Sequence, residues 1–204
     1  GIPKTKDEFG SEAYNDFGIV QRAIRFTTEL YPDLIVIADI CLCEYTSHGH
    51  CGVIEHDCIV NDKTLPLLAK ASVACAKAGA DIITFQLDAC PNPLHMLREV
   101  KKAGIKAGLG IGPSYDVERL RYLLPHIDGL ILMSVEPGYG GQPFEESIYE
   151  KVKRSVEIMD ETGIHVPISI DGGVNTVTGK KLVEAGADIL IAGSSVFGAD
   201  SITD

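Results

Sequence analysis

The 204-residue sequence has no tryptophan, no surplus of basic residues and no long uninterrupted apolar stretch. Its formal net charge of −11 argues against nucleic acid or an anionic membrane as a partner, because both require a basic surface. No apolar run approaches the roughly 20 residues that span a bilayer, and no charged-then-apolar leader opens the chain. We therefore expect a cytoplasmic protein of ordinary globular composition.

Six cysteines occur without a signal peptide, which favours free thiols or metal ligands over disulfides in a reducing cytosol. The length is sufficient for one sizeable core, and we expect a single barrel-like domain over residues 1–204.

Short apolar runs alternate with amphipathic stretches along the chain. The runs are nearly continuous in apolar residues, as expected for parallel strands covered on both faces. The candidate strands are Leu34–Asp39, Asp81–Leu87, Lys106–Ile111, Gly129–Val135, Val166–Asp171 and Asp188–Ala192. The candidate helices are Asp16–Leu30, Lys63–Ala78, Pro93–Ala103, Tyr115–Leu124, Glu145–Thr162 and Val177–Ala185. This rhythm predicts a parallel sheet with right-handed crossovers.

One unit of sequence is used twice, at residues 76–83 and 183–190, where a helix end, a Gly turn and a strand start follow one another as Ala-Gly-Ala-Asp-Ile. Repeated βα units build a (β/α)₈ TIM barrel. Because only about six parallel strands can be counted, we predict an incomplete barrel of this type, with a doubly wound sheet as the alternative. Exposed sheet edges would favour a homo-oligomer.

Three cysteines with unusual spacing follow the first candidate strand. Cys41 and Cys43 point to the same side if the extended geometry continues, and Cys51 can fold back toward them. Three thiolates with an open fourth position suit a divalent metal, zinc above all, acting as a Lewis acid. Small buried thiols are the alternative. Further ligands or supporting groups could come from Asp39, His48 and His50.

The segment Asp39–Gly52 closely resembles the zinc motif of porphobilinogen synthase, which condenses two aminolevulinate molecules, and the resemblance covers residues 1–82. It implies that Cys41, Cys43 and Cys51 hold zinc. The Schiff-base lysines of that family lie in motifs that this chain does not contain. Without a lysine whose pKa is lowered by desolvation, the chain has no nucleophile for covalent capture of a keto acid.

Three glycine-rich loops in the second half of the chain are suited to binding phosphate. They are Pro137–Gln142, Asp171–Gly173 and Ala192–Ser195. Backbone amides at strand ends can converge on a phosphate, assisted by the following helix N-terminus. We therefore predict a phosphate site at Gly172, Gly173, Gly193 and Ser194, with Gly140 and Gly141 in a loop that closes over the ligand. Tight turns are the alternative role of these glycines.

These loops resemble those of ribulose-phosphate 3-epimerase, a (β/α)₈ enzyme that inverts a carbon next to a ketone. The resemblance runs from about Ala78 to residue 204, and we assign residues 83–204 as the epimerase-like segment. The resemblance implies a small phosphorylated sugar as the ligand and Asp171 as a catalytic acid/base. That family uses two aspartates and a metal held by two His and two Asp. Only Asp171 can be placed here, and Thr84-Phe-Gln86 stands where the family shows Thr-x-His. We expect the epimerase activity to be impaired.

The two resemblances meet within Ala78–Phe85, which both families share in pattern. This position indicates a chimera that preserves the βα register. Three hypotheses follow from it. They are a sugar-phosphate-binding barrel of epimerase type, a zinc-binding fragment of porphobilinogen synthase type, and a recombined barrel without catalytic activity.

Overall fold

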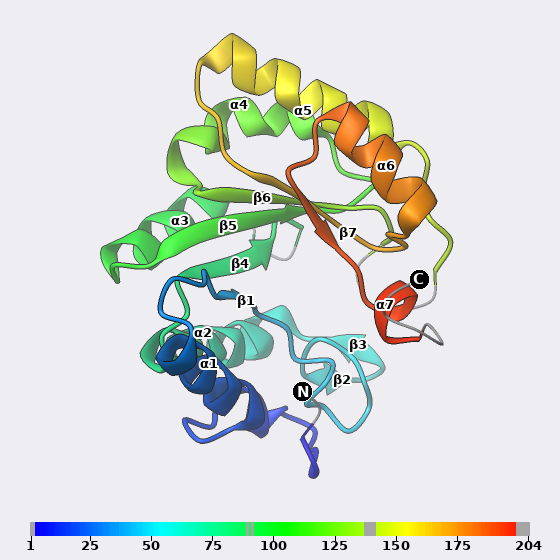
Figure 1. Cartoon of the computed structure of the whole chain (residues 1–204). Helices are drawn as coiled ribbons and strands as arrows, with labels where there is room; N and C mark the ends of the chain where they lie inside the picture. The colour runs from blue at the N-terminus through cyan, green and yellow to red at the C-terminus, as the bar shows by residue number, and fades with distance from the viewer. Residues whose placement is uncertain (1–2, 89, 91, 137–141, 199–204) are drawn as a thin grey trace. The chain divides into compact units, whose positions relative to one another are not determined.

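The computed structural model describes residues 3–88, 90, 92–136 and 142–198. The chain forms two compact units. Unit 1 holds Gly1–Thr84 and Gly104–Lys106, and unit 2 holds Phe85–Ala103 and Ala107–Asp204. The boundary at Thr84 falls inside the segment where the two sequence resemblances meet. The helices and strands of the chain are labelled in Figure 1.

Six strands are hydrogen-bonded neighbours in the order β1-β4-β5-β6-β7-β8. The pairs β1–β4, β5–β6, β6–β7 and β7–β8 are parallel. The strands span Ile37–Asp39 (β1), Ile82–Gln86 (β4), Lys106–Ile111 (β5), Gly129–Met133 (β6), Ile168–Asp171 (β7) and Ile189–Ile191 (β8). The predicted fold class, an α/β fold of the (β/α)₈ type with about six parallel strands, is confirmed.

The α-helices span Ile19–Leu30 (α1), Asn61–Ala78 (α2), Pro93–Lys102 (α3), Leu120–Leu123 (α4), Ile148–Thr162 (α5), Thr176–Ala185 (α6) and Ser194–Phe197 (α7). Helices α1 to α6 fall within or overlap the predicted helical stretches, whereas α7 was not predicted. Short 3₁₀ helices span Ser11–Tyr14 (η1), Val117–Arg119 (η2) and Leu124–His126 (η3). Among the described helices, none has the length and apolar character needed to cross a membrane.

A hairpin in unit 1 was not predicted. It pairs β2 (Ile54–Glu55) with β3 (Cys58–Ile59) in antiparallel fashion. Its two turn residues, His56 and Asp57, have φ angles of 50° and 60°. Two-residue hairpin turns usually place Asn-Gly or Asp-Gly at such left-handed positions, so His-Asp carried no turn signal.

An aspartate at the start of three strands makes the same pair of bonds to the strand before it. In each case its backbone N–H donates to the carbonyl, and its carboxylate accepts the backbone N–H, of one residue in or directly before the start of the neighbouring strand. The carboxylate bonds are 2.8 to 2.9 Å long. The carboxylates and the amides that they accept are Asp81 with Val36, Asp128 with Ala107, and Asp188 with Ile168. Two of these aspartate clamps belong to the repeated Ala-Gly-Ala-Asp unit, whereas Asp128 forms the same clamp after Ile127.

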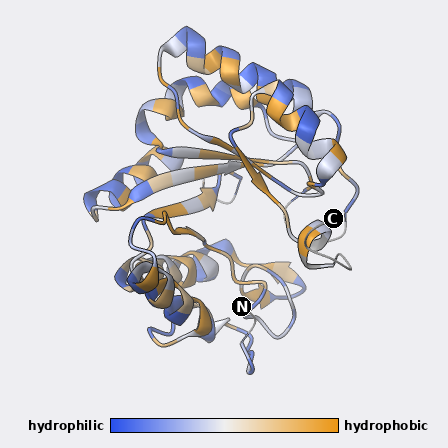
Figure 2. Ribbon diagram, viewed as in Figure 1, coloured by the Kyte–Doolittle hydropathy of each residue, from blue (hydrophilic) through white to orange (hydrophobic). Residues whose placement is uncertain are grey.

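Unit 2 contains the larger hydrophobic core. Alternate residues of β6 and β7, such as Leu130, Leu132 and Ile170, are fully buried in the same cluster as Val152 and Ile158 of α5. The strands are predominantly apolar, whereas the helices alternate between polar and apolar residues (Figure 2). In unit 1 the buried residues divide into two smaller clusters. Burial of apolar surface therefore stabilises unit 2 more than unit 1.

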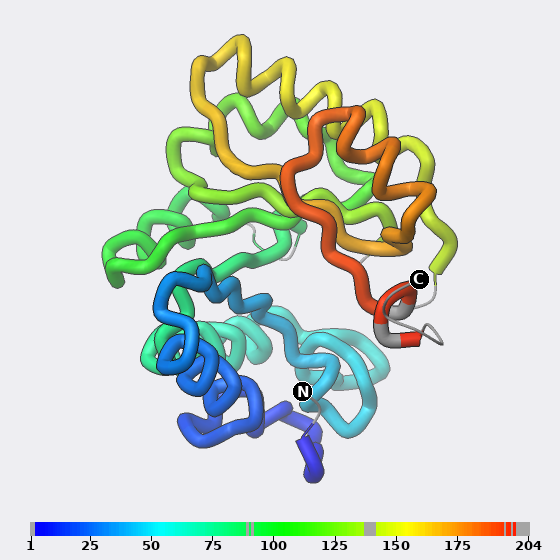
Figure 3. Tube along the Cα trace, viewed as in Figure 1, coloured from blue at the N-terminus to red at the C-terminus, as the bar shows by residue number. Residues whose placement is uncertain are grey.

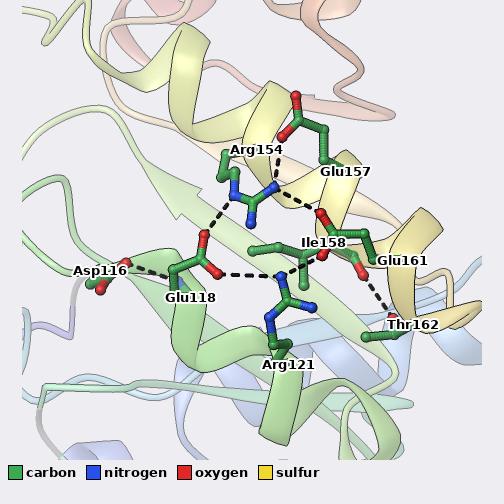
Figure 4. Close-up of polar contacts among 8 residues, drawn as sticks. All are labelled: Asp116, Glu118, Arg121, Arg154, Glu157, Ile158, Glu161 and Thr162. Atoms are coloured by element: carbon green, nitrogen blue, oxygen red, sulfur yellow. Dashed lines mark hydrogen bonds and ion pairs between the residues drawn. The ribbon is translucent and has the colours of Figure 1, made fainter.

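An ion-pair network on the surface of unit 2 ties η2 and α4 to α5 (Figure 4). Arg154 contacts Glu118 at 2.5 Å, Glu157 at 2.8 Å and Glu161 at 3.0 Å. Arg121 pairs with both Glu118 and Glu161. Hydrogen bonds from these guanidinium groups lower the pKa values of Glu118 and Glu161. The pairs are solvent-exposed, so each contributes little to stability.

Candidate functional site

Cys41 and Cys43 lie in the loop that follows β1. The side chain between them, Leu42, is fully buried in a core cluster of unit 1, while both cysteines are half-buried. The extended geometry on which the sequence prediction rested ends at Asp39, because the carbonyl of Leu42 accepts the backbone N–H groups of Tyr45 and Thr46 in a turn. The turn, and not strand alternation, brings the two thiols together.

Cys51 returns to the same place through a tightly packed loop. The hydroxyl of Thr46 donates to the carbonyl of His50 at 2.8 Å, which fixes the residue before Cys51. On the other side, Gly52 packs against α2, where a Cβ would lie 2.6 Å from Oγ1 of Thr64. Glycine is therefore required here by close approach.

The three thiols, which we name the thiol cluster, lie within hydrogen-bonding distance. Sγ of Cys41 lies 3.1 Å from Sγ of Cys43 and 3.0 Å from Sγ of Cys51. Hydrogen bonds from Cys41 and Cys51 lower the pKa of Cys43, and donating to Cys43 raises the pKa of Cys41. The cluster thus favours one thiolate even without a metal.

The donor set of the thiol cluster fits zinc. Tetrahedral zinc with Zn–S bonds of about 2.3 Å holds its sulfur ligands roughly 3.8 Å apart, so the cluster needs only a small expansion. Among the described residues it is also the one group of three or more His, Cys, Asp or Glu ligands close enough to hold an ion.

The other proposed ligands do not join this group. Nε2 of His48 lies 3.3 Å from the carbonyl of Glu8, and the rings of His48 and His50 stack with centroids 5.7 Å apart. Asp39 is likewise outside the set of mutually close ligand atoms. A zinc ion held by the three thiols alone would keep its fourth position open to water or substrate, as catalytic zinc sites do.

In unit 2, Asp171 is the last residue of β7, where it pairs in register with Met133 of β6 and Ile191 of β8. Burial raises the pKa of the Asp171 carboxyl, and a hydrogen bond from the Gly172 backbone opposes this in part. A carboxyl with a raised pKa is better suited to exchange a proton near neutral pH.

Ser134, which the sequence analysis did not single out, holds the peptide after Asp171 in place. Its hydroxyl donates to the carbonyl of Asp171 at 3.0 Å and also contacts the carbonyl of Gly172. Its backbone N–H donates to the same Asp171 carbonyl at 2.8 Å. Both acceptor carbonyls belong to a distant segment of the chain, so no local sequence pattern marked this serine.

The two glycines that follow Asp171 are required by backbone geometry. Gly172 has φ of 109°, and a Cβ there would lie 2.7 Å from the Val135 side chain. Gly173 has φ of 55° and packs against Phe144. The tight turn and the proposed phosphate contact are therefore compatible roles for the same two residues.

The N-terminus of α6 is already capped by its own side chains. Oδ1 of Asn175 accepts the backbone N–H groups of Val177 at 2.9 Å and Thr178 at 3.0 Å. The backbone N–H of Asn175 donates to the Thr178 hydroxyl in return. The backbone N–H groups at the start of α6 are thus already engaged, which restricts their expected contribution to phosphate binding. The amides of Gly172 and Gly173 are the remaining candidate donors to a phosphate. The chain runs from β7 through this turn into α6 (Figure 3).

The loop after β8 is joined to the same turn. The hydroxyl of Ser195 donates to the carbonyl of Val174 at 2.6 Å. A Cβ added at Gly193 would meet open space. Ser194 begins the short helix α7. Gly140 and Gly141, predicted to form a closing loop, lie outside the described residues.

The described residues of unit 2 do not bring together the metal ligands implied by the epimerase resemblance. They contain no group of three or more His, Cys, Asp or Glu ligands. Gln86 stands at the expected histidine position, and its buried Oε1 has no hydrogen-bond partner in the described part of the chain. We derive no catalytic step through a metal in unit 2.

Lys151, on the first turns of α5, is the lysine whose pKa is lowered by burial. Its ammonium donates to the carbonyls of Gly112, Pro113 and Tyr115 at 2.6 to 2.9 Å. These bonds hold the loop after β5, so this amine is not free to act as a nucleophile.

Comparison with family models finds two matches on overlapping parts of the chain. The model of the ribulose-phosphate 3 epimerase family matches residues 63–197. The model of delta-aminolevulinic acid dehydratase, the synonym of porphobilinogen synthase, matches residues 1–89. The chimera-like pattern expected from the sequence is thereby confirmed.

Individual relatives divide in the same way. A delta-aminolevulinic acid dehydratase of Halalkalibacterium halodurans is 49% identical over 126 residues, which cover 62% of this chain and 36% of the relative. A ribulose-phosphate 3-epimerase of Mycobacterium bovis is 42% identical over 125 residues, which cover 61% of this chain and 55% of the relative. The chain thus spans about half or less of either relative's length.

Solved structures support the fold. Delta-aminolevulinic acid dehydratase from Toxoplasma gondii aligns with a TM-score of 0.65 at 22% identity, covering 93% of this chain and 66% of that one. A 3-hexulose-6-phosphate synthase aligns with a TM-score of 0.56 at 17% identity, covering 89% and 75%.

Proposed function

Since the chain belongs to the ribulose-phosphate 3 epimerase family through residues 63–197, we propose that unit 2 binds a small phosphorylated sugar at the carboxyl ends of β7 and β8. The observation that carries this proposal is the position of Asp171 beside the Gly172-Gly173 turn, at the end of a parallel strand. Ligands of barrel enzymes bind at this end of the strands.

Binding would use backbone amides and the Asp171 carboxylate in separate roles. The amides of Gly172, Gly173 and Gly193 donate to the phosphate oxygens. The carboxylate of Asp171 faces the carbon beside the sugar's ketone, from which it can take a proton and to which it can return it. Inversion requires a second acid/base on the opposite face. We therefore propose that proton exchange survives and epimerisation is impaired.

Binding is tested by calorimetry and thermal melting with ribulose 5-phosphate and with inorganic phosphate. A hundredfold excess over Kd would stabilise the protein by roughly 2.7 kcal/mol. Gly193→Asp and Gly193→Ala form a matched pair, because the position has open space and only the first adds a charge. We expect the Asp variant to bind at least about tenfold more weakly than the Ala variant. No melting shift at millimolar ligand would contradict the proposal.

Proton exchange is tested in heavy water. Ribulose 5-phosphate is expected to gain one deuterium slowly, without appearance of xylulose 5-phosphate, and Asp171→Asn is expected to abolish the exchange. Rapid formation of xylulose 5-phosphate would show instead that a second acid/base is present.

Zinc binding by unit 1 is the second candidate function, favoured by the thiol cluster with its 3.0 and 3.1 Å sulfur separations. Bound zinc would supply a Lewis acid, while Cys41, Cys43 and Cys51 would fix its position. We expect about one zinc per chain by elemental analysis, lost in Cys41→Ser. Cys58→Ser is the matched control, because Cys58 is an exposed thiol outside the cluster. A metal-free protein after purification with zinc would rule this function out.

A recombined barrel without catalytic activity is the remaining hypothesis. It is favoured by the meeting of two family patterns inside one βα unit. Cooperative melting combined with no ligand shift, no deuterium exchange and no bound zinc would establish it over the other two.

A further inference from the structure

Helix α1 carries two apolar stripes, of which only one is packed. Its buried side includes Gln21 and Ile24 and lies against α2. The opposite side is exposed and repeats at intervals of four, three and four residues, the spacing of a helix–helix seam. The members of this exposed stripe are Ile19, Ala23, Phe26 and Leu30.

The exposed stripe is large for a surface that stays in water. Phe26 is 63% exposed, Leu30 53% and Ile19 44%. Tyr31 follows the stripe directly and is 62% exposed, whereas the Phe17 ring lies under the Arg25 guanidinium and is not part of the stripe. The stripe therefore presents an apolar patch on the order of 300 Å², which is at the lower end of the sizes at which a patch on a monomer is often functional.

One charge of each sign flanks the stripe. Arg22 and Glu29 are both exposed and lie two helical turns apart on the same edge. In the described part of the chain neither forms a salt bridge. Arg25, by contrast, is engaged within unit 1, where it donates to the Asp16 carbonyl and lies over the Phe17 ring.

We infer that the exposed stripe of α1 is the surface on which two copies of this chain associate, with their α1 helices antiparallel about a two-fold axis. This arrangement places a small side chain opposite a large one at the centre and opposite charges next to each other at the edge. The facing pairs, each formed twice, are Ile19 with Leu30, Ala23 with Phe26, and Arg22 with Glu29 of the second copy.

Other occupants fit the stripe less well. A parallel pair would set Phe26 against Phe26 and leave Arg22 and Glu29 without opposite charges. A membrane-binding helix carries lysines and arginines along its polar edges, whereas this edge is balanced and the chain has a net charge of −11. Since the patch is smaller than the roughly 800 Å² per partner of a standard interface, the dimer is expected to be weak.

The charge pair provides the test. Sedimentation velocity over a concentration series is expected to show a monomer–dimer equilibrium for the full chain. Arg22→Glu or Glu29→Arg alone places like charges opposite each other twice and is expected to raise the dimer Kd about tenfold. The double variant Arg22→Glu/Glu29→Arg restores both pairs and is expected to recover wild-type association.

Two further variants separate this surface from others. Phe26→Ala is expected to weaken association, whereas Tyr122→Ala, at a 74% exposed aromatic residue of unit 2, is expected to leave it unchanged. Circular dichroism confirms that each variant is folded. A monomer at all concentrations, a dimer indifferent to Phe26→Ala, or a double variant no better than the single ones would each overturn the inference.

Discussion

Asp171 is a carboxyl whose surroundings oppose its ionisation. It ends a parallel strand, and the backbone on either side is fixed by Ser134 and by the Gly172 turn. Burial outweighs the single hydrogen bond from the Gly172 backbone, so the pKa is raised above the ordinary value of 3.8. The folded protein therefore holds this proton more tightly than the unfolded chain does.

This shift predicts how Asp171→Asn changes with pH. Stability from a group with a raised pKa is fully present below its unfolded pKa of 3.8 and is lost as the pH rises through the folded value. Asn imitates the neutral acid, so the variant is expected to be more stable than the wild type at about pH 7 and equal to it at about pH 3. Urea unfolding at both pH values measures the difference, and a variant less stable at neutral pH would contradict the expectation.

The sequence was informative about residues whose role depends on local spacing. The cysteines of the thiol cluster could be grouped as candidate ligands from the C-x-C spacing and the Gly/His-rich loop before the third cysteine, but the turn at Leu42 that brings the thiols together was not predicted. Ser134 and Lys151 could not be assigned, because their hydrogen-bond acceptors are carbonyls of distant segments that only the fold brings near. The unpartnered Oε1 of Gln86 is likewise a property of packing, which spacing does not encode.

Among the elements, the strands and helices with strong periodicity were predicted within a few residues, and β5 (Lys106–Ile111) was predicted without error. The predicted helix Tyr115–Leu124 divides into η2, α4 and η3, and Pro125 lies at the start of η3. The short helix η1, with its buried Ala13, was not among the predicted elements. Such short elements depend on tertiary packing more than on their own sequence.

The contact between the loop of Cys51 and helix α2 yields a prediction at this scale. In Gly52→Ala the new methyl would meet Thr64, whose buried hydroxyl accepts the Val53 N–H at 3.0 Å. We expect a loss of about 1–3 kcal/mol in the free energy of unfolding. In a Thr64→Ala background the same change is expected to cost at least about 0.5 kcal/mol less. An equal loss of unfolding free energy in both backgrounds would show that Gly52→Ala creates no steric conflict with Thr64.

For the whole molecule, the unequal cores predict unequal local stability. The buried apolar residues of unit 2 form one large cluster, whereas those of unit 1 form two small ones. Hydrogen exchange is expected to be slowest in β5, β6 and β7, and faster throughout unit 1. Zinc should slow exchange around Cys41–Cys51 and α2, with little effect on unit 2. Uniform protection across both units would contradict this expectation.

The aspartate clamp explains how strands that resemble two different protein families can pair in one sheet. Asp81 reaches back to Val36, so the overlap at Ala78–Phe85 supplies the carboxylate while the earlier segment needs to offer only a backbone amide and a carbonyl. Every strand has these two groups, whatever its side chains. The hydrogen bonds at the junction therefore do not depend on which family supplies the earlier segment. Other βα fragments that end in Ala-Gly-Ala-Asp should replace it at this position.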